Sequence, residues 1–170
     1  MTSRFLLRHL AAIAILPVTV LVIVPVWIAR GSNLGVTPAA NVSGLLIQAI
    51  GIGALGVGFL LFAASLSRFA TEGKGTLAPW DPPRQLVITG PYRFVRNPMI
   101  SGVMFILVGE ACVLLSRPHA EWALIFCVTT LLYIPIFEEP ALAARFGPSY
   151  RQYASHVPRF VPRLRRWKGR

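Results

Sequence analysis

Four apolar runs dominate this 170-residue chain, and each is close to the length that a helix needs to cross a bilayer. They cover residues 10–29, 44–66, 98–115 and 121–137. A membrane-spanning helix needs about 20 mostly apolar residues. We therefore expect an all-α integral membrane protein, a single domain over residues 1–170 with about four transmembrane helices.

The composition supports lipid as the solvent of these runs. Hydrophobic residues make up 55% of the chain and the mean hydropathy is +0.62, which is more apolar surface than a soluble domain of this size buries. The net charge of +11 would suit nucleic acid, but a soluble basic domain does not carry such runs, so we expect no nucleic-acid partner. Cys112 and Cys127 lie inside the runs without Cys/His spacing, so we expect no metal site.

Lys and Arg residues are distributed unevenly about the four runs. The N-terminal residues, the loop 67–97 and the tail 138–170 hold two, five and eight of the 17 Lys and Arg residues. Only Arg30 and Arg117 fall on the opposite side. Because cytosolic loops carry the excess of positive charge, we expect the loop and both termini in the cytosol. The short chain without added domains favours a bacterial inner membrane.

The loop and the tail are expected to be structured cytosolic segments. The loop 67–97 is long and rich in Pro, Gly and aromatic residues, a composition typical of functional loops rather than flexible linkers. The tail should form short helical pieces that break at Gly147-Pro148 and at Pro158. Its last residues form a basic cluster that should lie on anionic membrane lipids.

Glu138 and Glu139 stand side by side where the fourth run ends, although the chain has only six acidic residues. Pro140 favours a break or a new helix start at this point. One interpretation is that both glutamates are helix-end charges that pair with Arg145 or other arginines of the tail. The other is that their apolar surroundings require a cationic partner, for which the ammonium group of an amino-acid ligand is a candidate.

A glycine-rich stretch, GIGALGVG, occupies residues 51–58 of the second run. Small residues at this density allow close packing of a neighbouring helix. They also allow a flat ligand to approach the backbone. Both interpretations fit the spacing.

Residues 90–99 read GPYRFVRNPM and lead into the third run. Pro98 suits the first turn of a helix, with Asn97 as its N-cap. Arg93 and Arg96 lie close to this helix N-terminus, where an anion is favoured. The arginines would hold either the carboxylate of a ligand or lipid phosphates.

Glu110 is the acidic residue inside the third run. Intramembrane acids are often functional, but Glu110 lies toward the outer half of the membrane, away from the other motifs. We expect it to make a structural hydrogen bond. No residue of the chain is a convincing general base, and no catalytic residue is assigned.

Taken together, these motifs resemble those of the membrane methyltransferases that include isoprenylcysteine carboxyl methyltransferases and phosphatidylethanolamine N-methyltransferases. The resemblance covers about residues 45–163. The segments that match the phospholipid branch are GVGF (56–59), NPM (97–99) and EEP (138–140). The segments that match the isoprenylcysteine branch are GPYRFVRNP (90–98) and FGPSYRQYASHVPRFVP (146–162). The latter branch usually has Arg-His-Pro where this chain has Arg96-Asn97-Pro98, so the phospholipid branch is the nearer comparison.

The resemblance implies S-adenosylmethionine as the cofactor, bound at the cytosolic membrane face. It implies methyl transfer to a lipophilic or membrane-embedded acceptor, either a phospholipid amine or a hydrophobic carboxylate. The glutamates, with Glu139 slightly preferred, would hold the ammonium group of the cofactor, and Arg96 or Arg159 its carboxylate. The expected cofactor-binding residues are Gly56, Val57, Gly58, Arg96, Asn97, Pro98, Glu138, Glu139 and Arg159.

Two other function classes stay open. A membrane reductase of related helical architecture would need a nicotinamide site, and the sequence has no separate phosphate-binding loop. A non-catalytic small transporter or scaffold would explain the helices without a cofactor. However, the two halves of the chain lack the repeat found in many transporters.

Overall fold

The computed structural model describes residues 14–32, 39–73 and 85–168, and every regular element in these ranges is a helix. The prediction of an all-helical protein is therefore confirmed. Residues 10–13 of the first predicted run and residues 74–84 of the predicted loop lie outside the described residues. The elements are the π-helix η1 (Ala14–Ile23), α2 (Val24–Gly31), α3 (Val42–Glu72), the 3-10 helix η2 (Gly90–Arg93), α4 (Pro98–Leu114), α5 (Arg117–Tyr133), the π-helix η3 (Ile134–Glu138) and α6 (Glu139–His156).

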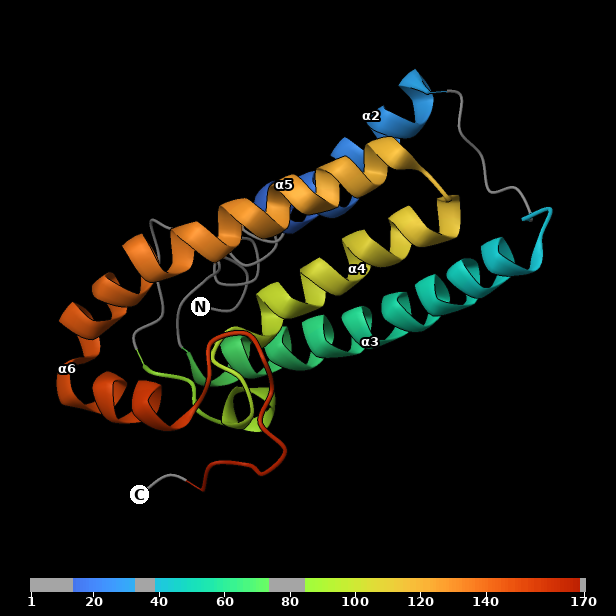
Figure 1. Ribbon diagram of the computed structural model, residues 1–170. Coiled ribbons are helices and arrows are strands. Elements are labelled where there is room, and N and C mark those ends of the chain that lie inside the picture. Colours follow the sequence, from blue (N-terminus) through green and yellow to red (C-terminus); the bar gives the residue numbers. More distant parts are fainter. Residues whose placement is uncertain (1–13, 33–38, 74–84, 169–170) are drawn as a thin grey trace.

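The long helices run roughly side by side, and α6 turns across one end of them (Figure 1). The segment that precedes α4 and the C-terminal segment meet at this same end (Figure 1). Among the residues that the structure describes, two helices are long and apolar enough to cross a membrane, namely α3 and the continuous helix Arg117–His156. The segments Pro17–Gly31 and Pro98–Leu114 are apolar but shorter.

The second helix is longer than the run 44–66 that predicted it. It begins at Val42 because Asn41 caps it, the side-chain Oδ1 accepting a hydrogen bond from the Gly44 backbone N at 2.8 Å. It continues to Glu72, so placing residues 67–72 in the loop was wrong. Those residues contain no Gly or Pro, and the helix ends where Gly73 follows.

The fourth helix begins at Arg117 rather than residue 121. Ser116 occupies its N-cap position and accepts from the His119 backbone N, with Pro118 in the first turn. Its far end is not at residue 137, because the backbone passes through the π-turn η3 into α6 without leaving the helix. Pro135 lies in that turn, and a wider turn accommodates a residue that donates no backbone hydrogen bond.

The breaks predicted in the tail are confirmed. Gly147 has φ 56° and ψ −129°, a conformation that interrupts α6 directly before Pro148 and is accessible mainly to glycine. The helix then ends at His156, two residues before Pro158. The break or new helix start expected near Pro140 is not present, because Glu138 and Glu139 are both helical and the helix Arg117–His156 is continuous there.

The packing of α3 on α4 depends on small residues seven positions apart. The buried residues of α3 are Gly44, Gly51, Gly58 and Ser65. Gly51 faces the backbone of Gly109, and Gly58 faces that of Gly102. A seven-residue spacing keeps one stripe of a helix against a neighbour, and the absence of side chains lets the two backbones approach closely.

The large apolar side chains of α3 point the other way. Leu60 is 73% exposed, and many further aliphatic side chains of α3 and α5 are exposed as well, including Ile50, Ile52, Leu124 and Leu132. Helices that bury glycine and expose leucine are stable in hydrocarbon rather than in water. The exposure pattern therefore agrees with lipid as the surroundings of these helices.

Candidate functional site

The C-terminal segment 158–167 lies against the residues that precede α4, and we call this segment the strap. It runs antiparallel to residues 93–96 and is held to them by backbone hydrogen bonds. Their donor and acceptor pairs are Arg96 N to Pro158 O (2.8 Å), Arg163 N to Phe94 O (3.0 Å) and Trp167 N to Arg93 O (3.0 Å). The strap therefore brings tail side chains to the N-terminal end of α4.

Glu139 forms the centre of an ion-pair cluster at this point. Arg159 of the strap binds it through two hydrogen bonds, Nε to Oε1 at 2.7 Å and Nη2 to Oε2 at 2.6 Å. Arg96 contributes a second cation, with its Nη1 2.9 Å from Oε1 of Glu139. The side chains of Glu139 and Arg96 are only 14% and 13% exposed. Such charge-assisted, partly desolvated pairs fix side-chain positions more firmly than surface pairs do.

Glu139 thus pairs with a tail arginine, as one of the two interpretations of the glutamate pair expects. That arginine is Arg159, 20 residues along the chain. Arg145 instead lies over the ring of Phe146, with its guanidinium carbon 5.8 Å from the ring centroid.

Glu138 is in a different position. It is half-buried, and within the described ranges it has neither a hydrogen bond nor an ion pair. Burial raises the pKa of its carboxyl, and the neighbouring charge of Glu139 raises it further. The charge of Glu138 also adds to burial in raising the pKa of Tyr92, which places this carboxylate near η2.

Arg96 also retains unused hydrogen-bonding capacity. Its Nε is buried and has no acceptor among the residues that the structure describes. A buried donor without an acceptor costs free energy, about 1–3 kcal/mol for an ordinary group, and such a donor is often found at a functional site. An unpaired carboxylate at Glu138 and an unpaired donor at Arg96 complement the ammonium and carboxylate groups of an amino acid.

Asn97 and Pro98 connect this cluster to α4. Pro98 is buried as the first residue of the helix, as predicted. Asn97 occupies the N-cap position, but its side chain makes no capping hydrogen bond, contrary to expectation. Its Nδ2 instead donates to the backbone O of Arg159 at 3.3 Å. The tertiary contact with the strap replaces the local cap.

Two tyrosines of α6 that the sequence motifs did not indicate lie next to the charged cluster. Tyr150 and Tyr153 are buried together with Val157, and Tyr153 donates its hydroxyl to the backbone O of Tyr92 at 2.7 Å. Burial is the first cause that raises the pKa of both hydroxyls, so they stay protonated and neutral. The spacing 150, 153 and 157 puts all three on one helical face, which is the signal that could have indicated them.

The glycine motif lies deeper in the bundle. A Cβ on Gly58 would lie 2.8 Å from Gly102 O and 2.9 Å from Ile106 N, so this glycine is committed to helix packing. Gly56 has nothing within 4 Å of such a Cβ, and both it and Val57 are exposed. Since Gly102 follows Pro98 by about one helical turn, Gly58 lies about one turn below the charged cluster.

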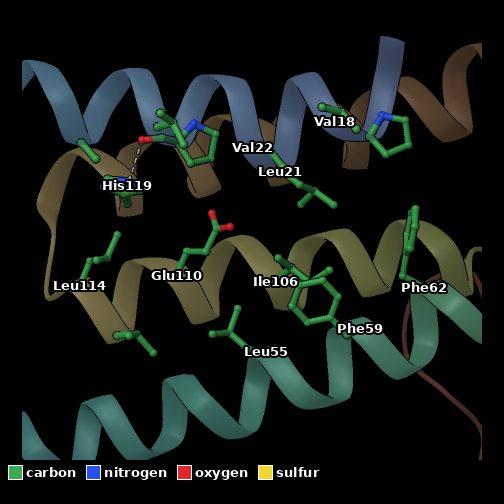
Figure 2. Close-up of a pocket in the computed structure, with 15 residues that line it drawn as sticks. Val18, Leu21, Val22, Leu55, Phe59, Phe62, Ile106, Glu110, Leu114 and His119 are labelled. Atoms are coloured by element: carbon green, nitrogen blue, oxygen red, sulfur yellow. Dashed lines mark hydrogen bonds between the residues drawn. The ribbon is translucent and has the colours of Figure 1, made fainter. Parts of the chain in front are cut away.

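A cavity of about 550 Å³ opens between the N-terminal helices and the pair α3–α4. Its walls are almost entirely apolar, with Leu55, Phe59 and Ile106 on one side and Leu21 and Val22 on the other (Figure 2). The carboxyl group of Glu110 points into it (Figure 2). The hydrogen bond expected for Glu110 is not found within the described parts of the chain.

His119 closes the end of the cavity beside Glu110. It is buried, with Nδ1 2.7 Å from Ser116 Oγ and Nε2 3.2 Å from the backbone O of Pro25. These contacts use both ring nitrogens and tie α5 to α2 (Figure 2). His119 is thereby a structural residue of the bundle.

The fold and the site define a helical membrane protein with a cluster of paired and unpaired charges at one end of its bundle. Residues 46–149 match the phospholipid methyltransferase family, and the chain belongs to that family. Methyltransferases of this family use S-adenosylmethionine. The resemblance to membrane methyltransferases inferred from the motifs is confirmed by this family match.

The chain is also similar to a curated protein, Methanethiol S-methyltransferase 2 of Bradyrhizobium diazoefficiens. The two are 37% identical over 76 residues, which are 43% of this chain and 27% of that relative. The matched region is thus a minor part of the relative. No solved structure matches the chain.

Proposed function

We propose that this protein transfers the methyl group of S-adenosylmethionine to a lipophilic acceptor, a phospholipid amine or a hydrophobic carboxylate, at the cytosolic membrane face. The observation that carries the proposal is the pair of unused polar groups in the cluster. Glu138 offers a carboxylate without a cation and Arg96 a buried donor without an acceptor, in the part of the chain that the structure describes. The family supplies the cofactor to which both groups are complementary.

The topology that goes with this function has four spans with both termini in the cytosol. At 1.5 Å per residue the 17 residues of α4 extend about 26 Å, close to the hydrocarbon thickness of about 30 Å. The N-terminal helices lie alongside α5 (Figure 1). The positive-inside distribution supports placing the charged cluster and the strap on the cytosolic side.

The residues of the cluster would share the binding of the amino-acid end of the cofactor. Glu138 would hold the ammonium group, and the free Nε of Arg96 would hold the carboxylate. Glu139 would act indirectly, because it keeps the guanidinium of Arg96 in place and ties Arg159 of the strap to the same point. This division of roles revises the preference for Glu139 as the ammonium ligand.

The only link between the glycine motif and the cofactor is the corresponding motif of the family, which is assigned to cofactor binding. Gly56 and Val57 present an uncrowded surface, on which an adenosine ring could approach the backbone. Gly58 contributes by holding α3 close to α4. The assignment of Gly56, Val57 and Gly58 to the cofactor stays a prediction.

S-adenosylmethionine supplies an electrophilic methyl group on a positively charged sulfur. The residues of the chain mainly have to align donor and acceptor and to keep water away. The buried tyrosines Tyr150 and Tyr153 and the strap, which lie against the cluster, would provide that exclusion. An amine acceptor would have to lose a proton, and no residue is assigned to remove it.

A lipophilic acceptor is supported by the apolar cavity between the N-terminal helices and α3–α4. Ile106, which lines the cavity, also lies in the packing contact of Gly58, so the cavity begins near the level of the glycine motif. Hydrocarbon of an acceptor entering from the bilayer would find an apolar site there. The similarity to Methanethiol S-methyltransferase 2 favours a thiol as a second candidate acceptor.

Cofactor binding is tested by calorimetric titration of the detergent-solubilised protein with S-adenosylhomocysteine. We expect saturable binding that Glu138→Gln weakens by at least tenfold, because a neutral amide replaces the proposed ammonium ligand. Glu121→Gln is the matched control, since Glu121 is exposed and pairs only locally with Arg117. Equal affinity in the Glu138 variant and the wild type would refute the proposed role of Glu138, and absence of binding would refute the function.

The acceptor is then identified with methyl-labelled S-adenosylmethionine. The reconstituted protein is offered phosphatidylethanolamine, a long-chain fatty acid and methanethiol in parallel, and the products are separated by partition and chromatography. Label in the lipid amine or in the ester supports the primary proposal. Label only in a volatile thioether would replace it with thiol methylation.

A further inference from the structure

The strap exposes apolar side chains that nothing in the described structure covers. Leu164 is 100% exposed and Val161 is 77% exposed, and Phe94, the residue hydrogen-bonded to the strap through its backbone, is partly exposed as well. Isolated exposed apolar residues are common on protein surfaces. Three of them on two paired segments next to a membrane helix form a surface that suits insertion into an interface.

Unpaired cations follow these apolar residues at the end of the strap and directly after it. Arg165, Arg166 and Lys168 are exposed and have no ion pair among the residues that the structure describes. Arg163 differs, because its Nη1 donates to the backbone O of His156 at 2.6 Å. The free positive charges therefore follow directly after Leu164 in a sequence that reads RLRRWK from residue 163 to 168.

The position of the strap places this surface at the level of lipid headgroups. Its backbone is bonded to residues 93–96, and Pro98 two residues later is the first residue of the apolar helix α4. A segment fixed to the start of a membrane helix lies at the membrane interface by geometry. Exposed apolar side chains with flanking cations are the combination that binds anionic bilayers.

We propose that the strap is a docking surface for anionic phospholipid headgroups, with Val161 and Leu164 inserted into the interface and Arg165, Arg166 and Lys168 on the phosphates. Docking couples to the site because the strap also carries Arg159, which grips Glu139 through two hydrogen bonds. Anionic lipid therefore stabilises the strap in the conformation that completes the charged cluster. This coupling rests on the proposed function, whereas the docking itself does not.

Exposed apolar side chains next to the cations favour a lipid surface over other anionic partners. Val161 and Leu164 precede the free cations on the same segment, and an acyl interface can bury their exposed side chains while a nucleic acid cannot. Each basic residue near an anionic membrane contributes a factor of about five to binding. For three cations the docking equilibrium should differ by on the order of 100-fold between anionic and neutral bilayers.

Docking is measured on the full chain in lipid nanodiscs made of phosphatidylcholine alone or with about a third phosphatidylglycerol. An environment-sensitive fluorophore is attached to Leu164→Cys, with Cys112 and Cys127 replaced by alanine. We expect a blue-shifted, salt-sensitive emission in the anionic discs, and a return to the neutral-disc emission when Arg165, Arg166 and Lys168 are all changed to Gln. Emission that is the same in both discs, or unchanged by the triple substitution, would overturn the proposal.

The control variant removes charge from the other end of the bundle. Arg30→Gln with Arg117→Gln lowers the net charge without touching the strap, and it should leave the emission in anionic discs unaltered. A loss of the blue shift in this control would mean that overall charge, not the strap, determines the response. That result would overturn docking by the strap.

The coupling is measured as the affinity for S-adenosylhomocysteine in the same discs. We expect several-fold tighter binding in anionic discs for the wild type, and no lipid dependence in the triple variant. If the fluorescence shows docking but the lipid composition does not change the affinity for S-adenosylhomocysteine, the coupling is overturned and only the docking surface remains. Absence of all cofactor binding would refute the proposed function, while the fluorescence result would still decide the docking.

Discussion

The glycine pair on α3 offers the sharpest test of the structure, because Gly56 and Gly58 differ in surroundings but not in type. A Cβ on Gly58 would meet backbone atoms, Gly102 O at 2.8 Å and Ile106 N at 2.9 Å, which cannot rotate away as a side chain can. At Gly56 a Cβ would meet nothing within 4 Å. Replacing each by alanine therefore separates helix packing from helix propensity.

The magnitudes follow from these distances. Overpacking of a close contact costs about 1–3 kcal/mol, and alanine gains about 1 kcal/mol over glycine in a helix interior. Gly58→Ala should thus be less stable than Gly56→Ala by about 1–3 kcal/mol. For a chain of this size each kcal/mol shifts the unfolding temperature by about 2–4 °C, so the two variants should differ by several degrees.

Thermal unfolding in detergent can be followed with a thiol-reactive dye. Cys112 is a suitable reporter once Cys127, which is also half-buried, is replaced by alanine. Cys112 packs directly against Gly51 in the same interface, so opening of the α3–α4 contact increases its exposure. The reasoning is refuted if Gly58→Ala unfolds at the same temperature as Gly56→Ala or above it. If Gly56→Ala instead keeps its stability but loses affinity for S-adenosylhomocysteine, the family assignment of this motif to the cofactor gains direct support.

Three further predictions concern the charged cluster and its support. Affinity for S-adenosylhomocysteine should rise with pH through a range above the ordinary glutamate pKa of about 4.3. The raised pKa of Glu138 keeps its carboxyl protonated at low pH, whereas the ammonium group of the ligand needs the ionised carboxylate. Calorimetry should show an affinity independent of pH for Glu138→Gln, and the same pH independence in the wild type would contradict the assignment. Glu139→Gln should lower the free energy of unfolding by about 1–3 kcal/mol, which is less than for a fully buried ion pair because the side chain of Arg159 is 36% exposed. An unfolding temperature equal to that of the wild type would show that the cluster does not hold the strap. Tyr153→Phe should lose about 1–2 kcal/mol by the same measurement because the carbonyl O of Tyr92 loses its donor, and an unchanged unfolding temperature would argue against that hydrogen bond.

The start of α4 was predictable and the extent of its neighbours was not. Pro98 marks the start by local chemistry alone, since proline is favoured in the first turn. The end of α3 was misplaced by six residues, from 66 to Glu72, because hydropathy falls at the membrane edge although the backbone has no reason to leave the helix there. Apolar runs indicate where lipid ends, whereas the helix continues through polar residues as far as Glu72, directly before Gly73.

The candidate site was predictable in its residues and not in their roles. The sequence brought Arg96, Arg159 and the glutamates together as motifs of one family. It did not distinguish Glu138 from Glu139, because adjacent helical residues point about 100° apart and only packing decides which of them faces the strap. The pairing of Glu139 with Arg159 joins residues 20 positions apart, beyond any local pattern.

The sequence by itself indicated apolar surroundings for this protein, its helical class, its family and the uneven distribution of its Lys and Arg residues. The helical class and the apolar surroundings follow from composition and short-range periodicity, which act residue by residue, whereas the family follows from the motifs that the chain shares with it. The tertiary structure decided which glutamate is paired, that the side chain of Asn97 binds the strap instead of capping α4, and that Gly58 serves packing while Gly56 stays open. Each of these depends on the relative phase and distance of segments far apart in the chain, which only the folded chain fixes.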